Sequence, residues 1–341
     1  MARVSAEDAG AIAKKLEGYK EFVGSYESKD NAASKAELAV KDTALIVTLS
    51  GQPALALIEK SKDVFSINGF PETYQVKIKR EADSRVGAMI FSQPEGEFEY
   101  KRAAAAAAVA AVAAAPQMTV DELMAKVITA LGGEANWRKL TSRVVKYELD
   151  FVNQGVKGSG TQYAKAPNMS AAESTLTALG KPIGWLSEYF NGAEAGEATS
   201  FTTAERATGK ALEDARLNAD FYGLVNWKIN YKRAEMKAAS KVGDEDAYVI
   251  SFEPEKGNKD VLYFSSKTFL PVKLETAVTF TSAGIDLPYT ETYADYRAVD
   301  GVMIAFKTIN ANISNGEIIT VLKEVKHNVP VDDKVFKPRE K

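Results

Sequence analysis

The side chains that most often carry out chemistry in proteins are scarce in this sequence. It contains no cysteine and one histidine, His327. The absence of cysteine excludes disulfides, thiolate nucleophiles and cysteine-ligated zinc or iron–sulfur sites. A single histidine excludes every site that needs two, such as HExxH zinc sites and 2-His-1-carboxylate iron sites. Composition therefore disfavours most metalloenzymes and most histidine-based catalysis.

His327 could act as the base of a Ser-His-Asp triad. However, the sequence has no Gly-x-Ser-x-Gly elbow, and no serine is followed by a lysine three residues later. The nucleophile motifs of two large hydrolase classes are thus missing. We therefore expect His327 to be a structural or surface residue, and we predict no catalytic residue, no metal site, no cofactor and no enzymatic activity.

Two other patterns could bind a ligand but have simpler explanations. Asp332-Asp333 places two carboxylates side by side, yet Lys334 follows them, which is typical of a solvated turn rather than of a cation site. The glycine-rich segment 155–160 lacks the Lys-Ser/Thr ending of a phosphate loop, so a hairpin is the better interpretation.

Aromatic residues are the more informative group. They gather around a helical segment predicted for residues 203–218 and around the aromatic segment 221–227. Core packing alone could explain them, but they could also line an apolar cavity between a curved sheet and the helices. The candidate ligand-binding residues are Trp185, Phe190, Phe201, Phe221, Tyr222, Leu224, Trp227 and Phe306.

Length and charge exclude further classes of protein. The chain has 341 residues, enough for two domains, and a formal net charge of −3 from 43 basic and 46 acidic side chains. Without an excess of positive charge, nucleic-acid binding is not expected. No apolar stretch is long enough for a transmembrane helix, and residues 1–18 lack the apolar core of a secretory signal. The protein is therefore expected to be either cytoplasmic or exported, and in the second case a leader would have been removed before this sequence begins.

The clearest boundary is a run of alanine and valine at residues 103–115, which Pro116 follows. Alanine has the highest helix propensity, and proline ends a helix. We predict three parts: a small accessory domain at 1–102, a helical linker at 103–116 and a larger domain at 117–341.

Both domains are predicted to be mainly β. In the first, a helix at 7–20 precedes short strands, which indicates a small antiparallel barrel or sandwich. In the second, Thr119 and Glu122 form a capping box before a helix with one apolar stripe. A long antiparallel series follows, with hairpin signals at Asn191-Gly192, Asp300-Gly301 and Asn315-Gly316. The fold class is a small β-barrel linked by an Ala-rich helix to a larger incomplete antiparallel barrel with a helical lid.

Several separated motifs in residues 118–341 support a family resemblance. They are the stretches 120–133, Glu188-Tyr189-Phe190-Asn191-Gly192, 242–250, 263–272, 293–302 and 328–336. In their order and spacing they resemble the outer-membrane lipoprotein-sorting proteins, the LolA/LolB-like lipid carriers. The resemblance implies a half-barrel that carries a lipid, a periplasmic location, and contact with a membrane surface or a lipoprotein.

The first domain resembles a different family. The segments 22–27, 51–53 and 85–91 look like the small β-domain found carboxy-terminal to serine beta-lactamase-like hydrolases, over about residues 15–102. The hydrolase domain itself is absent.

Two functions follow from the sequence. The first is a non-catalytic, extracytoplasmic bacterial protein that binds a lipid, an acyl chain or another apolar ligand in a half-barrel cavity. The second is an accessory or interaction module of a secreted hydrolase system, with no small-molecule ligand. A co-purified apolar ligand would favour the first, and a protein partner bound at sheet edges or loops the second.

Overall fold

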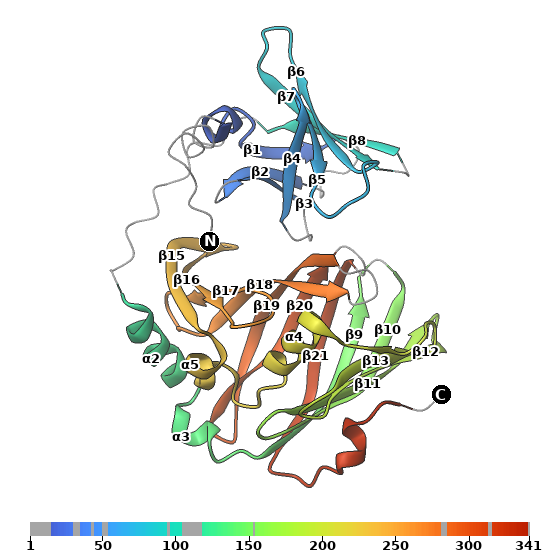
Figure 1. Ribbon diagram of the computed structural model, residues 1–341, viewed down its shortest axis with the longest axis vertical. Helices are drawn as coiled ribbons and strands as arrows, with labels where there is room; N and C mark the ends of the chain where they lie inside the picture. The colour runs from blue at the N-terminus through green and yellow to red at the C-terminus, as the bar shows by residue number, and fades with distance from the viewer. Residues whose placement is uncertain are drawn as a thin grey trace. The chain divides into compact units, whose positions relative to one another are not determined.

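The computed structural model describes residues 15–29, 35–41, 44–49, 54–93, 96–103, 118–152, 154–280, 285–312 and 316–339. They belong to two compact units, residues 1–110 and 111–341, which are described one at a time (Figure 1). Most of the predicted linker and residues 7–14 of the predicted first helix lie outside the described residues; residues 15–19 are helical.

The first unit is a closed antiparallel barrel of eight strands. The strands are β1 (Gly24–Ser28), β2 (Lys35–Lys41), β3 (Ala44–Leu49), β4 (Leu55–Ser61), β5 (Val64–Ile67), β6 (Gln75–Arg80), β7 (Val86–Gln93) and β8 (Gly96–Arg102). β1 pairs with β8 and closes the barrel, which leaves no free sheet edge. The first two strands were not predicted from the sequence.

Alternating side chains fill the barrel. Leu45 and Val47 of β3 are fully buried, and Leu45 is registered opposite Leu57 of β4. Phe65 and Tyr26 are also buried, and the Tyr26 hydroxyl donates a hydrogen bond of 2.6 Å to the carbonyl oxygen of Phe22. Burial of one face of each strand is the physical reason that these short segments pair.

The second unit is one antiparallel sheet of 13 strands with a few helices. Its order is β14-β13-β12-β11-β10-β9-β21-β20-β19-β18-β17-β16-β15. The first half contains β9 (Ser142–Phe151), β10 (Val156–Lys165), β11 (Met169–Ala178), β12 (Lys181–Phe190), β13 (Ala195–Thr199) and β14 (Glu205–Arg206). The second half contains β15 (Arg233–Val242), β16 (Glu245–Glu253), β17 (Asp260–Ser265), β18 (Pro271–Phe280), β19 (Ile285–Val299), β20 (Val302–Asn312) and β21 (Gly316–His327).

The helices lie at the start and in the middle of this unit. α2 (Val120–Ala130) and α3 (Glu134–Trp137) precede the sheet; α4 (Gly209–Asn218), the 3-10 helix η1 (Gly223–Asn226) and α5 (Trp227–Asn230) connect its two halves. A last 3-10 turn, η2 (Asp333–Phe336), follows β21. The small barrel, the larger open sheet and the few helices confirm the predicted fold class.

Three local predictions are tested by these elements. The capping box of α2 is confirmed, since Thr119 accepts from the amide of Glu122 and the Glu122 carboxylate accepts from the amide of Thr119. The Asp300-Gly301 turn is confirmed, with φ of 50° and 81°. At Asn191-Gly192 a two-residue turn is wrong: residues 191–194 form a longer loop, in which the Asn191 side chain accepts from two following amides.

The helix predicted for residues 203–218 is shorter in the structure. Its first part is the strand β14, and only Gly209–Asn218 is helical. Gly209 has a φ of 54°, which favours a turn at the point where the helix begins. Asn315 lies outside the described residues, so its turn stays a prediction.

The sheet curves, and one of its faces holds the helices (Figure 1). We call the face that carries Arg143, Val145 and Tyr147 of β9, together with their registered neighbours, the inner face. Ala164, which is registered opposite Arg143, packs there with Phe221. The opposite face is the outer face, and Phe336 of the carboxy-terminal tail packs on it.

Candidate functional site

Helix α2 and the segment after α4 cover the last strands of the inner face. Leu123, Met124 and Val127 of α2 pack against buried side chains of β16 and β17. Leu224 and Trp227 lie partly buried against the same cluster. The Trp227 ring is 6.2 Å from that of Phe252, in an edge-to-face arrangement. Two of the predicted ligand-binding residues therefore also serve as packing residues here.

A second apolar cluster lies on β20 and β10. Phe221 and Phe306 are buried there together with Trp137, and Tyr222 packs against them partly buried. The Tyr222 hydroxyl donates to the carbonyl oxygen of Leu140 at 3.4 Å. Phe190, at the end of β12, belongs to a third cluster beneath α4. The structure thus brings Phe221, Tyr222 and Phe306 together and keeps Phe190 apart from them.

The two remaining candidates lie on opposite faces of β12. Trp185 is on the outer face, where the guanidinium carbon of Arg339 is 4.2 Å from its ring centre. Phe201 follows β13 and is 58% exposed; its ring lies over the inner-face position Gly184, where a Cβ would come within 2.3 Å of it. Seven of the eight predicted residues therefore lie on the inner face, and their role as ligand contacts stays a prediction.

The middle of the inner face carries residues that the sequence analysis did not single out. Tyr147 crosses Gly160 to reach β11, where its hydroxyl and that of Ser174 are 2.7 Å apart. A Cβ at Gly160 would lie 2.8 Å from the Tyr147 ring and 2.3 Å from the carbonyl oxygen of Glu173. Glycine at this position therefore lets the tyrosine lie flat on the sheet. The spacing Gly158-x-Gly160 was the available signal, and the pairing of β9 with β10 gives it meaning.

Apolar side chains in the same region are only partly buried. Leu149, Leu186, Ile318 and Leu322 all project from the inner face and are half-buried. In a sheet packed directly against helices such residues would be fully buried. The middle strands therefore leave apolar surface that no described helix covers.

Carboxylates and tyrosines line the same face. On β19, the half-buried Tyr293 donates to Glu291 at 3.0 Å. Burial raises the pKa of Glu291, although hydrogen bonds from Tyr293 and Thr308 act in the opposite direction. Burial also raises the pKa of the Tyr293 hydroxyl well above its usual range. At neutral pH this tyrosine is a neutral hydrogen-bond donor.

Glu188 of β12 has an unusual environment. It is registered opposite Glu197 of β13, which is in turn opposite Glu205 of β14. Burial raises the pKa of Glu188, and the Glu197 carboxylate raises it further. Solvent still reaches the Glu188 side chain. The Glu188 carboxylate is thus partly desolvated by its neighbours on the inner face while water remains in contact with it.

Helix α4 joins the two halves of the sheet across the inner face (Figure 1). On one side, its Leu212 and Ala215 pack against Phe190 and its neighbours. On the other side, the Asp214 carboxylate accepts from the backbone amide and the side-chain amide of Asn258, both at 2.6 Å. No side chain of α4 is buried. The helix is therefore held at its two sides and weakly along its length.

An ion pair also holds α4 to β19. The Lys210 ammonium lies 2.5 Å from the Asp286 carboxylate, and both side chains are partly exposed. Burial acts to raise the pKa of Asp286, but hydrogen bonds from Lys210 and Thr279 outweigh it, so the pKa is lowered. We call α4 with these contacts the strap.

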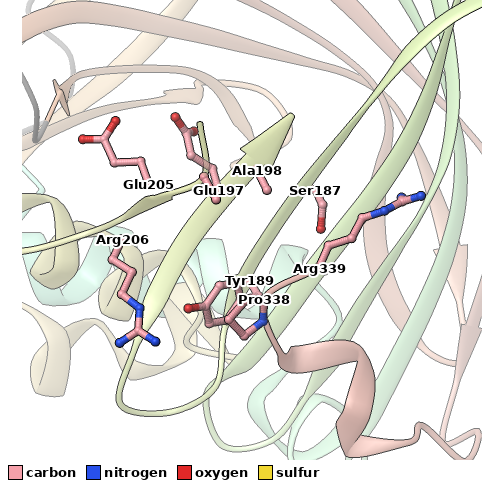
Figure 2. A pocket seen from close by; sticks show the side chains of 9 residues that line it. Ser187, Tyr189, Glu197, Ala198, Glu205, Arg206, Pro338 and Arg339 are labelled. Atoms are coloured by element: carbon pink, nitrogen blue, oxygen red, sulfur yellow. The ribbon is translucent and has the colours of Figure 1, made fainter. Parts of the chain in front are cut away.

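A small pocket of about 170 Å³ opens on β12–β14 beside the carboxy-terminal tail (Figure 2). Tyr189 points its hydroxyl toward Arg206, while Arg339 points away from it (Figure 2). The Tyr189 ring is 8% exposed, and its hydroxyl has no hydrogen-bond partner among the described residues. The pocket is too small for the apolar ligand that the sequence analysis predicts.

His327, the single histidine of the sequence, is buried and contacts Asp300. The His327 side chain is 1% exposed, and its Nδ1 lies 3.0 Å from an Asp300 oxygen. Its pKa is lowered, mainly by burial, and Arg143 adds to this while the hydrogen bond to Asp300 opposes it. Asp332 and Asp333, in turn, accept from the amide of Lys334 and from the Lys165 ammonium.

Two other features are absent from the described ranges. No group of three or more histidine or carboxylate side chains in them could hold a metal ion. None of their helices is both long and apolar enough to cross a membrane.

Known proteins resemble this chain in structure rather than in sequence. No family model matches the chain, and no curated protein matches it in sequence. A LolA superfamily protein from Nitrosomonas europaea is similar in structure, with 16% identity, a TM-score of 0.42, and coverage of 65% of this chain and 98% of the other. A DUF1329 family protein from Desulfovibrio piger has 10% identity, a TM-score of 0.43, and coverage of 64% and 97%.

A domain from Vibrio parahaemolyticus assigned to outer-membrane lipoprotein sorting has 12% identity, a TM-score of 0.42, and coverage of 63% of this chain and 94% of its own. The resemblance of residues 15–102 to a hydrolase-associated β-domain stays a prediction. The lipoprotein-sorting proteins that the motifs of residues 118–341 resemble thus also occur among the structurally similar proteins, and at these identities the likeness is one of fold alone.

Proposed function

We propose that this chain is a non-catalytic, extracytoplasmic binding protein that holds a lipid, an acyl chain or another apolar ligand against the inner face. One observation carries the proposal. Half-buried apolar side chains, among them Leu149, Leu186 and Leu322, lie on the middle strands of a face that the strap crosses. Covering such side chains with an apolar ligand is favourable by about 25 cal/mol per Å² of apolar area removed from water.

The motif resemblance to lipid carriers supports the same function and the extracytoplasmic location. The ligand-contacting residues that we retain are those of the inner face: Phe190, Phe201, Phe221, Tyr222, Leu224, Trp227 and Phe306. Trp185 lies on the outer face and is left out of the proposed site. Delivery would then involve contact with a membrane surface or a lipoprotein.

Native mass spectrometry of the full chain, followed by lipid extraction, tests the proposal. We expect a stoichiometric adduct that organic solvent removes. Leu149→Trp fills the inner face and should abolish the adduct, whereas Glu148→Trp places the same ring on the exposed outer face of β9 and should retain it. A ligand-free protein that also takes up no lipid from mixed vesicles would refute the carrier function.

A further inference from the structure

Arg143 is a cation on the inner face, at the beginning of β9. It is registered between Ala164 of β10 and His327 of β21, and it is half-buried. Its guanidinium carbon lies 5.7 Å from the centre of the Phe221 ring. The charged group therefore lies directly beside the apolar cluster of Phe221 and Phe306.

Within the described ranges, no carboxylate forms an ion pair with Arg143, and no protein group accepts a hydrogen bond from it. Its registered neighbour His327 is itself directed to Asp300. Arg297 provides the contrast: it stacks on Phe306 at 4.4 Å, but Asp295 binds its guanidinium through two hydrogen bonds, of 3.0 and 2.6 Å. Two similar arginine–phenylalanine contacts thus differ in whether the charge is compensated.

An uncompensated guanidinium in such a place is costly. Burial lowers the pKa of Arg143, which shows that the surrounding protein disfavours its charge. Removing a charge from water without a partner destabilises a protein. Arginine remains protonated in proteins and presents a planar fork of donors that fits carboxylate and phosphate oxygens. An anion that reaches Arg143 would offset the cost of desolvation.

We propose that Arg143 binds the anionic head group, a carboxylate or a phosphate, of an amphiphile whose acyl chain lies along the inner face. The inference rests on the proposed function and gives the ligand its polarity and its orientation. From Arg143 the inner side of β9 runs past the buried Val145 to the half-buried Tyr147 and Leu149, about 20 Å at the rise of a strand, the length of a long acyl chain. The Tyr147 ring, which covers Gly160, and the Leu149 side chain, which covers Gly158, form the surface on which the chain lies.

Isothermal titration of the full chain, delipidated, tests the inference with four probes: hexadecanoate, hexadecyl phosphate, hexadecanol and inorganic phosphate. We expect both anionic amphiphiles to bind at least tenfold more tightly than the alcohol, and inorganic phosphate to bind far more weakly than hexadecyl phosphate. Arg143→Gln should reduce the preference for the anions to within twofold and leave hexadecanol binding unchanged. Arg297→Gln, the matched control, should retain the preference.

Thermal unfolding without ligand gives a second readout. Because the guanidinium lacks an ion-pair or hydrogen-bond partner among the described residues, Arg143→Gln should melt at the same temperature as the wild type or higher, and a loss of several degrees would reveal a structural partner and overturn the inference. Equal binding of the acid and the alcohol by the wild type would also overturn it while leaving the carrier function intact. Inorganic phosphate binding as tight as that of hexadecyl phosphate would assign Arg143 to a free anion instead. No binding of any amphiphile would refute the carrier function itself.

Discussion

At the scale of single residues, the polar groups of the inner face differ in how far hydrogen bonds offset the free-energy cost of their desolvation. Tyr147 and Tyr293 have hydrogen-bond partners, so their hydroxyls are accommodated with little penalty. Glu188 and Arg143 lack such partners among the described residues, and burial shifts the pKa of each toward the neutral form. Uncompensated polar groups of this kind cluster at functional sites more often than in structural cores.

Glu188 leads to a prediction about pH. Its pKa is raised in the folded protein, so between its ordinary value of about 4.3 and the raised value the folded state binds more protons than the unfolded one. Stability therefore falls as pH rises through this window. Glu188→Gln removes the effect and should raise the melting temperature at pH 7. The gain in the free energy of unfolding should be less than about 1 kcal/mol, as for an opposed pair of like charges.

The stabilisation by Glu188→Gln should decrease as the pH falls and be small near pH 4, where most of the wild-type carboxyl is protonated in both states. Glu173→Gln, an exposed position on the outer face of β11, is the control and should show no such dependence. Differential scanning calorimetry between pH 4 and pH 8 measures both variants. A gain that is equal at every pH would mean that the charge of Glu188 is not responsible.

Several residue positions could be predicted from the sequence, and others could not. The alternation of apolar residues in β20 is enough to place Val302, Ile304 and Phe306 on one face, because the side-chain period of a strand is two, and all three are buried in one cluster. The face of Trp185 could not be derived in this way, since it depends on how β12 pairs with β11 across a register shift. Arg143 was missed because its significance lies in the lack of an ion-pair partner among the described residues, which only the packed structure reveals.

At the scale of elements, sequence motifs predict structure correctly where the hydrogen bonds that form it join residues close together in the sequence. The capping box of α2 needs only Thr119 and Glu122 at the correct spacing. The sequence overestimated α4, because alanine and glutamate near residue 204 favour a helix while pairing with β13 makes Glu205–Arg206 a strand. Tertiary pairing thus overrode helix propensity at this point.

The strap leads to a prediction about motion. Asp214→Ala removes both hydrogen bonds from Asn258, and hydrogen bonds to charged groups contribute about 1.5–3 kcal/mol each. Alanine has a higher helix propensity than aspartate, so the substitution should not unfold the helix by itself. We expect the amides of α4 to exchange hydrogen for deuterium at least tenfold faster, and bound hexadecanol to dissociate several-fold faster.

Glu213→Ala is the matched control for Asp214→Ala. The Glu213 side chain pairs with Arg216 within α4 and is not one of the contacts that hold α4 to the sheet. Its exchange and dissociation rates should stay within twofold of the wild type. Unchanged exchange in Asp214→Ala would show that the apolar contacts of Leu212 and Ala215 hold α4 on their own.

At the scale of the whole molecule, the chain forms two separate cores. The barrel buries Leu45 against Leu57 and their neighbours, and it is closed, so every strand already has two partners. The larger sheet buries Ile250 with Leu123 and Phe252. Units of 110 and 231 residues are each large enough to be stable through their own core.

Separate cores predict separate unfolding of the full chain. Leu45→Ala and Ile250→Ala each remove a fully buried aliphatic group, which costs about 2–5 kcal/mol. Leu45→Ala should lower only the calorimetric transition of the barrel, by about 10 °C or more, and Ile250→Ala only that of the larger unit, by a smaller shift because its unfolding entropy is greater. An amphiphile bound to the inner face should raise the second transition alone, because a ligand stabilises the unit to which it binds. Each variant is the control for the other, and one cooperative transition that both substitutions lower equally would show that the two units unfold as one.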